Sequence, residues 1–360
     1  MRAMQALKIL AGPRARAHLR ERGLSPGDVR VIPAAAGGPK GLVLNPLDRF
    51  VFGSWLGASA QTVHLLGASI GAWRMACACL PDADAALARL ADDYIAQEYP
   101  HEPGKAPLSR DVSRIFGATL DDRLGRRADE VLSHPTRRLH VVTSRGRHLM
   151  RREGRLRTPL GYLGAFATNL VSRRAMGGWL ERVMFSDPRE ALPFALRDYR
   201  TRQVPLKRDN LGASVLASCS IPFWLDAVHD IPGAPRGAYW DGGITDYHLH
   251  LDYARMDEGL VLYPHFQDTV VPGWLDKALR HRHGATARLS NVVLLTPDAQ
   301  WVRACMPNGK LPDRGDFKAY GERVADRRRD WARAVAESAR LADEFAELVR
   351  RPAIEALPLV

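Results

Sequence analysis

The chain has 360 residues, of which 46% are hydrophobic and 26% charged, and its formal net charge is +12. This balance is ordinary for a folded globular protein and excludes a disordered chain or a collagen-like repeat. No apolar run approaches the roughly 20 residues of a membrane-spanning helix. The start of the chain lacks the apolar core of a signal peptide. We therefore expect a cytoplasmic protein.

The order of predicted elements indicates the fold class. Residues 3–22 predict a basic N-terminal helix that ends at Gly23, within an N-terminal segment 1–28. Strands and helices then alternate, which is typical of a three-layer α/β/α fold with a mostly parallel central sheet. We expect strands over 29–34, 62–66, 139–143, 259–264 and 291–295, helices after 41 and over 70–80 and 83–98, and a loop over 101–109.

A glycine-rich loop follows the first of these strands and reads Ala36-Gly37-Gly38-Pro39-Lys40-Gly41. Glycines between a strand and a helix leave backbone N–H groups uncovered, and the helix adds the positive end of its dipole. Such a loop binds a phosphate or the oxyanion of a tetrahedral intermediate. Pro39 has no N–H, so Gly37, Gly38, Lys40 and Gly41 are the candidate donors. A plain turn is the alternative, and the spacing fits neither a Walker A loop nor a dinucleotide loop.

The pentapeptide Gly67-Ala68-Ser69-Ile70-Gly71 lies between an apolar run and a predicted helix. That is the strand–turn–helix context of a nucleophile elbow, in which the serine hydroxyl is pushed out of the backbone. Gly67 and Gly71 let the strand and helix approach closely. The N–H of Ile70, just after the serine, is a further oxyanion donor.

A third signal is Asp241-Gly242-Gly243, which follows the predicted strand end 237–240. An aspartate at a strand end with two glycines behind it exposes its carboxylate in a loop mouth. Taken alone, Asp241 is as well explained as a turn aspartate bonded to its own backbone.

Together these three motifs resemble the patatin-like phospholipases, which carry a glycine-rich oxyanion loop, a Gly-x-Ser-x-Gly elbow and an Asp-Gly-Gly box in this order. A fourth segment, Ala217-Ser218-Cys219-Ser220-Ile221-Pro222, is similar to the family's Ala-Ser-x-Ala-x-Pro. The resemblance covers roughly residues 29–246. The one departure is Ala36, which stands where the family has its first glycine.

The resemblance implies a catalytic dyad in which Ser69 is the nucleophile and Asp241 its general base, without cofactor or metal. Gly37, Gly38, Lys40 and Ile70 would form the oxyanion hole, Gly67 and Gly71 the elbow, and Gly242 and Gly243 the aspartate box. A Ser-His-Asp triad is the rival arrangement, because five histidines follow Asp241: His248, His250, His265, His281 and His283. The four cysteines have no metal-ligand spacing and are expected to be reduced.

Three segments bear on partners and domain organisation. Residues 137–157 hold eight arginines and one acid. This charge favours either peripheral contact with the anionic inner face of a membrane or a basic surface that is simply exposed to solvent. No nucleic-acid-binding motif is present in the sequence, and no nucleic-acid partner is expected. Residues 160–186 predict an apolar helical segment, either a lid or a core helix pair. Within 311–360, residues 316–351 predict a long amphipathic helix packed on the catalytic domain 29–310.

The leading hypothesis is therefore a serine hydrolase that cleaves carboxylic esters of lipids, of the phospholipase A, lysophospholipase or lipid acyl hydrolase type. Its partner would be a lipid or ester substrate. Two alternatives stay open: a non-catalytic lipid- or membrane-binding protein, and an acyltransferase that uses the same acyl-enzyme.

Overall fold

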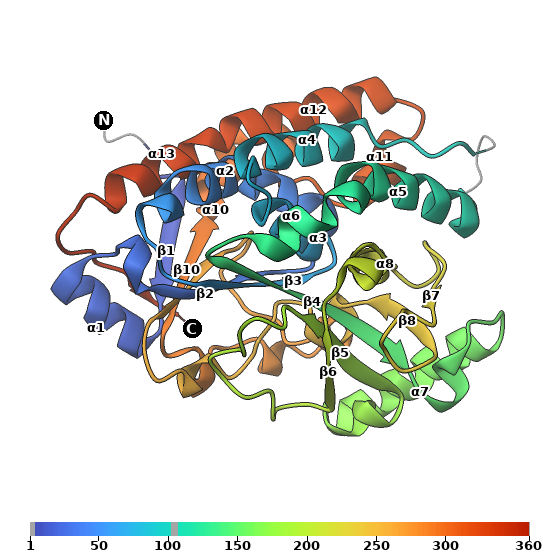
Figure 1. Cartoon of the computed structure of the whole chain (residues 1–360). Coiled ribbons are helices and arrows are strands. Elements are labelled where there is room, and N and C mark those ends of the chain that lie inside the picture. Colours follow the sequence, from blue (N-terminus) through green and yellow to red (C-terminus); the bar gives the residue numbers. More distant parts are fainter. Residues whose placement is uncertain (1–3, 102–106, 360) are drawn as a thin grey trace.

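The computed structural model describes residues 4–101 and 107–359, which build one 11-stranded sheet (Figure 1). The strand order is β11-β1-β10-β9-β2-β3-β4-β5-β6, and β8 joins β4 and β7 off this path. The five central strands from β10 to β4 run parallel to one another. The strands are β1 (Leu7–Ala11), β2 (Val29–Ala34), β3 (Val63–Ala68), β4 (Arg137–Gly146), β5 (Leu180–Ser186), β6 (Thr201–Pro205), β7 (Val228–His229), β8 (Ala238–Asp241), β9 (Leu260–Pro264), β10 (Val292–Pro297) and β11 (Leu357–Pro358).

Helices flank this sheet and complete a three-layer α/β/α fold. In Figure 1, α2, α4, α12 and α13 lie together along one side of the molecule, and α7 lies at the opposite side. No helix of the described residues is long and apolar enough to cross a bilayer. The α-helices are α1 (Pro13–Arg22), α2 (Asn45–Gly53), α3 (Ile70–Ala78), α4 (Ala83–Ala96), α5 (Ser109–Leu124), α6 (Ala128–Ser133), α7 (Arg157–Val171), α8 (Arg208–Cys219), α9 (Gly243–Asp246), α10 (Ala299–Cys305), α11 (Gly315–Tyr320), α12 (Val324–Glu337) and α13 (Ala339–Leu348).

The central strands are buried on both faces, as expected for a parallel sheet covered by helices. Every residue of β3 and of β10 is buried, which explains why both read as continuous apolar runs. Because the strands β2 and β3 are parallel, their carboxyl ends lie at the same edge of the sheet. In open α/β sheets this edge is where ligands bind.

Most elements predicted between residues 29 and 100 are confirmed. The strand over 29–34 is β2, the strand over 62–66 is β3 shifted by one or two residues, and the helices over 70–80 and 83–98 are α3 and α4. The later strands over 139–143, 259–264 and 291–295 fall on β4, β9 and β10. Residues 102–106 of the loop predicted over 101–109 lie outside the described residues.

The predicted N-terminal helix over 3–22 is wrong in its first half. Residues 7–11 form β1, an edge-side strand that pairs antiparallel with β10 and parallel with β11. The helix α1 begins only at Pro13, a residue that is favoured in the first helical turn. Basic residues at 14, 16, 20 and 22 produced a helical pattern that we extended too far upstream.

Two further helix predictions need correction. Residues 160–186 are α-helical only up to Val171, with a short 3-10 turn at Ala175–Gly178, and residues 180–186 form the buried strand β5, antiparallel to β4. The long helix predicted over 316–351 is divided into α11, α12 and α13. Gly321 at φ +52 ends α11, a backbone conformation that glycine adopts without strain.

Candidate active site

Ser69 lies in the sharp turn between β3 and α3, with φ 57 and ψ −131. A non-glycine residue holds such a backbone conformation only where its surroundings impose it, and such strain is frequent at active sites. The close packing comes from the two flanking glycines. A Cβ on Gly71 would lie 2.0 Å from the carbonyl oxygen of Ala34, and one on Gly67 would lie 2.3 Å from the Cα of Ala72.

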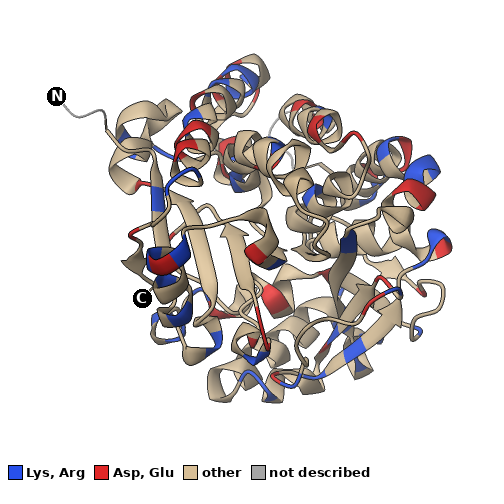
Figure 2. Ribbon diagram, turned by 60° about the vertical axis from the view of Figure 1, so that its left-hand side comes forward, with Lys and Arg blue, Asp and Glu red and all other residues tan. Residues whose placement is uncertain are grey.

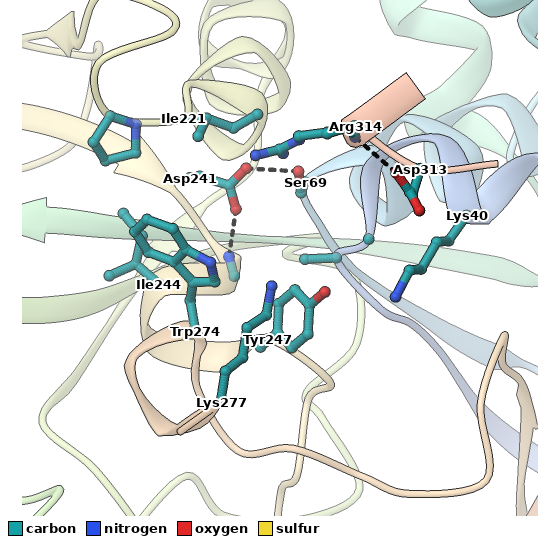
Figure 3. Close-up of a pocket in the computed structure, with 15 residues that line it drawn as sticks. Lys40, Ser69, Ile221, Asp241, Ile244, Tyr247, Trp274, Lys277, Asp313 and Arg314 are labelled. Carbon is teal, nitrogen blue, oxygen red and sulfur yellow. Dashed lines mark hydrogen bonds between the residues drawn. The ribbon is translucent and has the colours of Figure 1, made fainter. Parts of the chain in front are cut away.

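Asp241 is the last residue of β8, which pairs antiparallel with β4. The Ser69 hydroxyl donates a 2.6 Å hydrogen bond to Oδ2 of Asp241, and the N–H of Gly243 donates a 2.7 Å bond to Oδ1 (Figure 3). The two residues are 172 positions apart in the chain. The fold therefore brings the predicted nucleophile and the predicted base into direct contact.

The segment 217–222 connects these two residues. The Ser218 hydroxyl accepts a 2.9 Å hydrogen bond from the backbone N–H of Ser69 and donates one of 2.6 Å to the carbonyl of Val142 on β4. The N–H of Asp241 donates to the carbonyl of Ser220 at 2.8 Å. This segment thus fixes the backbone on both sides of the serine–aspartate pair.

Burial controls the electrostatics of the pair. Ser69 and Asp241 are only 3% and 6% exposed. Burial raises the pKa of Asp241, while the hydrogen bond from Ser69, the positive charge of Arg314 and the N–H of Gly243 act in the opposite direction. A carboxylate with a raised pKa is a stronger base, which partly compensates for the weakness of a carboxylate toward a serine hydroxyl.

The glycine-rich loop lies beside Ser69, at the carboxyl end of β2. The backbone N–H groups of Gly37, Gly38 and Ile70 donate no hydrogen bond to any group in the described part of the chain. Unpartnered N–H groups next to a serine hydroxyl can receive the negative oxygen of a tetrahedral intermediate. Gly37 has no room for a side chain, because a Cβ there would lie 2.4 Å from the ring of Phe266.

Ala36, the departure from the family pattern, fits without displacing the loop. Its N–H donates a 2.9 Å hydrogen bond to the carbonyl of Tyr247. A Cβ on Gly243 would lie 2.6 Å from the Ala36 methyl group, so the missing side chain at 243 leaves room for the methyl at 36.

A cavity of about 280 Å³ opens above the pair. Of the predicted site residues, Gly37, Lys40, Ser69, Asp241 and Gly243 line it. Gly38, Gly67, Ile70, Gly71 and Gly242 are not among the lining residues. Most of the other lining residues were not predicted, because they come from chain segments without a recognisable motif. They are Ile244, Tyr247, Trp274, Lys277, Asp313, Arg314 and Gly315.

The rival Ser-His-Asp triad is not assembled by the described residues, since none of the cavity-lining residues is a histidine. The buried His248 accepts a hydrogen bond at Nδ1 from the N–H of Val271, and Nδ1 of the buried His265 lies 2.6 Å from the carbonyl oxygen of Gln267. These imidazoles contact backbone groups, and the hydroxyl of Ser69 has a carboxylate as its partner.

The four cysteines are free, and burial raises the pKa of the Cys77 and Cys79 thiols to about 12. Such thiols are poor nucleophiles and poor metal ligands at neutral pH. Among the residues that the structure describes, no three histidine, cysteine or acidic side chains gather in a way that could hold a metal ion.

Comparisons with known proteins give little beyond these observations. No family model matches the chain, and no curated protein matches it. Among solved structures, it is similar to VipD from Legionella pneumophila at 13% sequence identity and a TM-score of 0.35, over 97% of this chain and 71% of that one. At such values the match carries no argument about function.

Proposed function

We propose that this protein is a serine hydrolase of the patatin-like type that cleaves carboxylic esters of lipids. The observation that carries the proposal is the 2.6 Å hydrogen bond between the Ser69 hydroxyl and Asp241, both buried at the base of a cavity. A strained serine at the elbow, a paired carboxylate and free N–H groups beside them are the parts that acyl transfer requires.

The reaction would proceed in two steps. In the first, Ser69 Oγ attacks the ester carbonyl while its proton passes to Asp241 Oδ2, and the leaving alcohol takes that proton as the acyl-enzyme forms. In the second, Asp241 accepts a proton from water, the resulting hydroxide attacks the acyl group, and the acid is released as the proton returns to Ser69.

The N–H groups of Gly37, Gly38 and Ile70 would hold the oxyanion in both steps. In other serine hydrolases one oxyanion donor contributes about 3 kcal/mol of transition-state stabilisation. These donors are backbone groups fixed by the ends of β2 and β3, so they need no rearrangement when charge develops on the carbonyl oxygen.

A lipid ester is favoured by the apolar side of the cavity. Ile221, Pro222 and Trp274 line it together with Ile244. A cavity of about 280 Å³ is near the lower end of the size of ligand pockets. It holds the ester and its immediate neighbours, and the remainder of a long acyl chain would extend over the apolar surface outside.

The alternatives differ in what happens to the acyl group. An acyltransferase would use the same acyl-enzyme and pass the acyl group to an alcohol. A non-catalytic binding protein has no need of a serine hydroxyl held by a buried carboxylate, so the Ser69–Asp241 pair favours an enzyme.

The test is hydrolysis of p-nitrophenyl esters from acetate to palmitate by the wild type, Ser69→Ala and the control Ser133→Ala, whose serine is exposed. We expect release of p-nitrophenol and free acid by the wild type and the control only, with a preference for longer chains. Transfer of the acyl group to added glycerol in preference to water would indicate the acyltransferase. A wild type no faster than Ser69→Ala on any ester would reject an acyl-transfer enzyme.

A further inference from the structure

Three cationic side chains surround the candidate active site. Lys40, Lys277 and Arg314 all line the cavity that contains Ser69 (Figure 3). They come from three separate segments: the glycine-rich loop, the long connection between β9 and β10, and the segment that leads into α11. Within the described part of the chain, none of the three makes a side-chain hydrogen bond or an ion pair.

The three groups approach the reacting atoms from different sides. Nε of Arg314 lies 3.2 Å from where a Cβ of Gly38 would stand, directly beside the oxyanion loop. Nζ of Lys277 lies 4.0 Å from the ring centre of Tyr247, and Nζ of Lys40 lies 5.5 Å from that of Phe266. Both lysines are therefore held over aromatic rings with their ammonium groups available.

The negative charge in the cavity does not balance these cations. Asp313 accepts hydrogen bonds of 2.7 Å from the N–H of Gly315 and from Lys310, so its charge is already shared. Asp241 is the proposed base and is neutralised whenever it carries the serine proton. Burial, Arg314 and Lys40 together lower the pKa of Lys277 to about 8, although its side chain still reaches solvent. A bound anion would relieve this repulsion.

We propose that Lys277 and Arg314, with Lys40, form a subsite for an anionic group of the substrate, a phosphate or a carboxylate close to the scissile ester. That the substrate is an ester cleaved at Ser69 rests on the proposed function. The small cavity requires the anionic group to lie within a few bonds of the ester, and an arginine with a lysine is the usual pair for such groups.

The test compares three substrates with the same acyl chain: 1-oleoylglycerol, its phosphate (lysophosphatidic acid) and its hemisuccinate. We expect kcat/KM for at least one anionic ester to exceed that for the neutral ester by about tenfold to a hundredfold. Lys277→Ala and Arg314→Ala should each bring the ratio of kcat/KM for the anionic ester to kcat/KM for the neutral ester down toward one. Lys318→Ala, an exposed lysine on α11, leaves the ratio unchanged. The hemisuccinate carries a carboxylate in place of the phosphate. A preference for both anionic esters would indicate a general anion site, and a preference for lysophosphatidic acid alone would indicate a phosphate site.

Measuring the preference for anionic esters over a range of pH tells whether it depends on the positive charge of Lys277 or only on the shape of its side chain. Lys277 faces Arg314, Lys40, Asp241 and the Tyr247 ring, and its positive charge is lost as the pH rises through about 8. The anionic preference should therefore fall between neutral pH and pH values well above 8 in the wild type and persist in Lys277→Arg. A ratio near one in the wild type, or one that Lys277→Ala and Arg314→Ala leave intact, would overturn the subsite.

Binding to Ser69→Ala by calorimetry keeps this proposal distinct from the catalytic one. If the wild type hydrolyses no ester, tighter binding of lysophosphatidic acid than of 1-oleoylglycerol still supports the subsite, and equal binding of the two rejects it.

A second inference comes from α7, whose outward face is apolar. Its large side chains at helical spacing point into solvent: Leu160 is 56% exposed, Leu163 64%, Leu170 49% and Val171 85%. The opposite stripe, which includes Tyr162 and Ala165, is buried. A helix that is apolar on its solvent side marks a docking surface.

α7 lies next to the wall of the cavity, and its buried stripe makes the contact. The ring of Tyr162 on α7 contacts the ring of Phe223 at 5.9 Å between centres. Phe223 and Trp224 are exposed, at 61% and 43%, and follow directly after Ile221 and Pro222 of the cavity wall. Exposed apolar side chains therefore lie both on α7 and beside the cavity wall, and Tyr162 connects the two segments.

Charge around this face is positive. No acidic residue occurs between Glu153 and Glu181. In this stretch Arg155, Arg157 and Arg174 are exposed, whereas Arg173 pairs with the buried Asp246 and Asp276. Elsewhere acidic and basic residues are interspersed along the ribbon (Figure 2). Part of the basic stretch 137–157 makes contacts within the fold and is not available to a partner. Arg137 is buried against backbone carbonyls, and Arg145 pairs with Glu181.

We infer that the outward face of α7, with Phe223 and Trp224, docks on an anionic lipid surface. The apolar side chains would enter the acyl boundary, and the exposed Arg155, Arg157 and Arg174 would contact headgroups. This places membrane contact on residues 155–174, downstream of the stretch that charge alone indicated.

Vesicle flotation tests this docking surface, with vesicles of phosphatidylcholine alone and mixed with phosphatidylglycerol. We expect the wild type to bind the mixed vesicles. The double variant Leu160→Glu/Leu163→Glu should bind them at least about tenfold more weakly than the wild type. Leu357→Glu, which changes a leucine of similar exposure on β11, should bind as the wild type does. Thermal unfolding confirms that each variant is folded.

Three results would overturn the docking surface. They are no wild-type binding to either vesicle, equal binding of Leu160→Glu/Leu163→Glu and wild type, and a wild-type dimer that this variant dissociates. The last would assign the face to a second copy of the chain.

Discussion

Replacing Ser69 with alanine or Asp241 with asparagine is expected to lower kcat/KM for ester hydrolysis by about a thousandfold or more. The first change removes the nucleophile that donates its hydrogen bond to the buried carboxylate, and the second removes the proton acceptor 2.6 Å from that hydroxyl. Because the two groups act as a unit, the double variant should be no worse than the poorer single variant. Asp257→Asn, an exposed aspartate, serves as the matched control.

The same variants separate catalysis from folding. The pKa of Asp241 is raised in the folded state, so this group favours folding below its ordinary pKa, and the benefit is lost as the pH rises through the raised value. At neutral pH, Asp241→Asn should therefore unfold at the same temperature as the wild type or higher. Loss of activity with a lower unfolding temperature would mean that Asp241 is structural. Full activity in Asp241→Asn would reject the dyad.

Replacing Gly71 with alanine is expected to destabilise the fold by about 3 kcal/mol or more and to abolish activity. The new Cβ would lie 2.0 Å from the carbonyl oxygen of Ala34, so α3 must move away from β2 and take Ser69 with it. The measurement is the free energy of unfolding in urea, together with ester hydrolysis.

Gly57→Ala is the control, because a Cβ at Gly57 would meet no atom within 4 Å. Its unfolding free energy should stay within a few tenths of a kcal/mol of the wild type, as for other surface substitutions. If Gly71→Ala were as stable and active as Gly57→Ala, the close contact of elbow and strand would not be what holds the serine in place.

The sequence alone predicted the centre of the molecule well. Buried parallel strands read as apolar runs, and glycines mark turns where backbones approach closely, so β2, β3 and the elbow at Ser69 could be located. The resemblance to a known family then paired Ser69 with Asp241, which no local pattern could have done. The hydrogen bond between them follows from the pairing of β8 with β4, a contact between residues far apart in the chain.

The remainder depended on tertiary structure. Residues 7–11 and 180–186 carry apolar side chains whose spacing does not distinguish a helix from a buried strand, and pairing with β10 and β4 decided both cases. Lys277 and Arg314 carry no motif, and only the folded chain brings them beside Ser69. Similarly, helical spacing in α7 predicted an apolar stripe, but not that this stripe faces solvent.

Covalent labelling tests the central claim most directly. The protein is treated with a long-chain alkyl fluorophosphonate, which phosphonylates activated serines, and the modified peptide is identified by mass spectrometry. We predict a single adduct on Ser69, absent from Ser69→Ala and formed much more slowly in Asp241→Asn. No adduct on the folded wild-type protein, or an adduct on another serine that persists in Ser69→Ala, would contradict the assignment of Ser69 as the nucleophile.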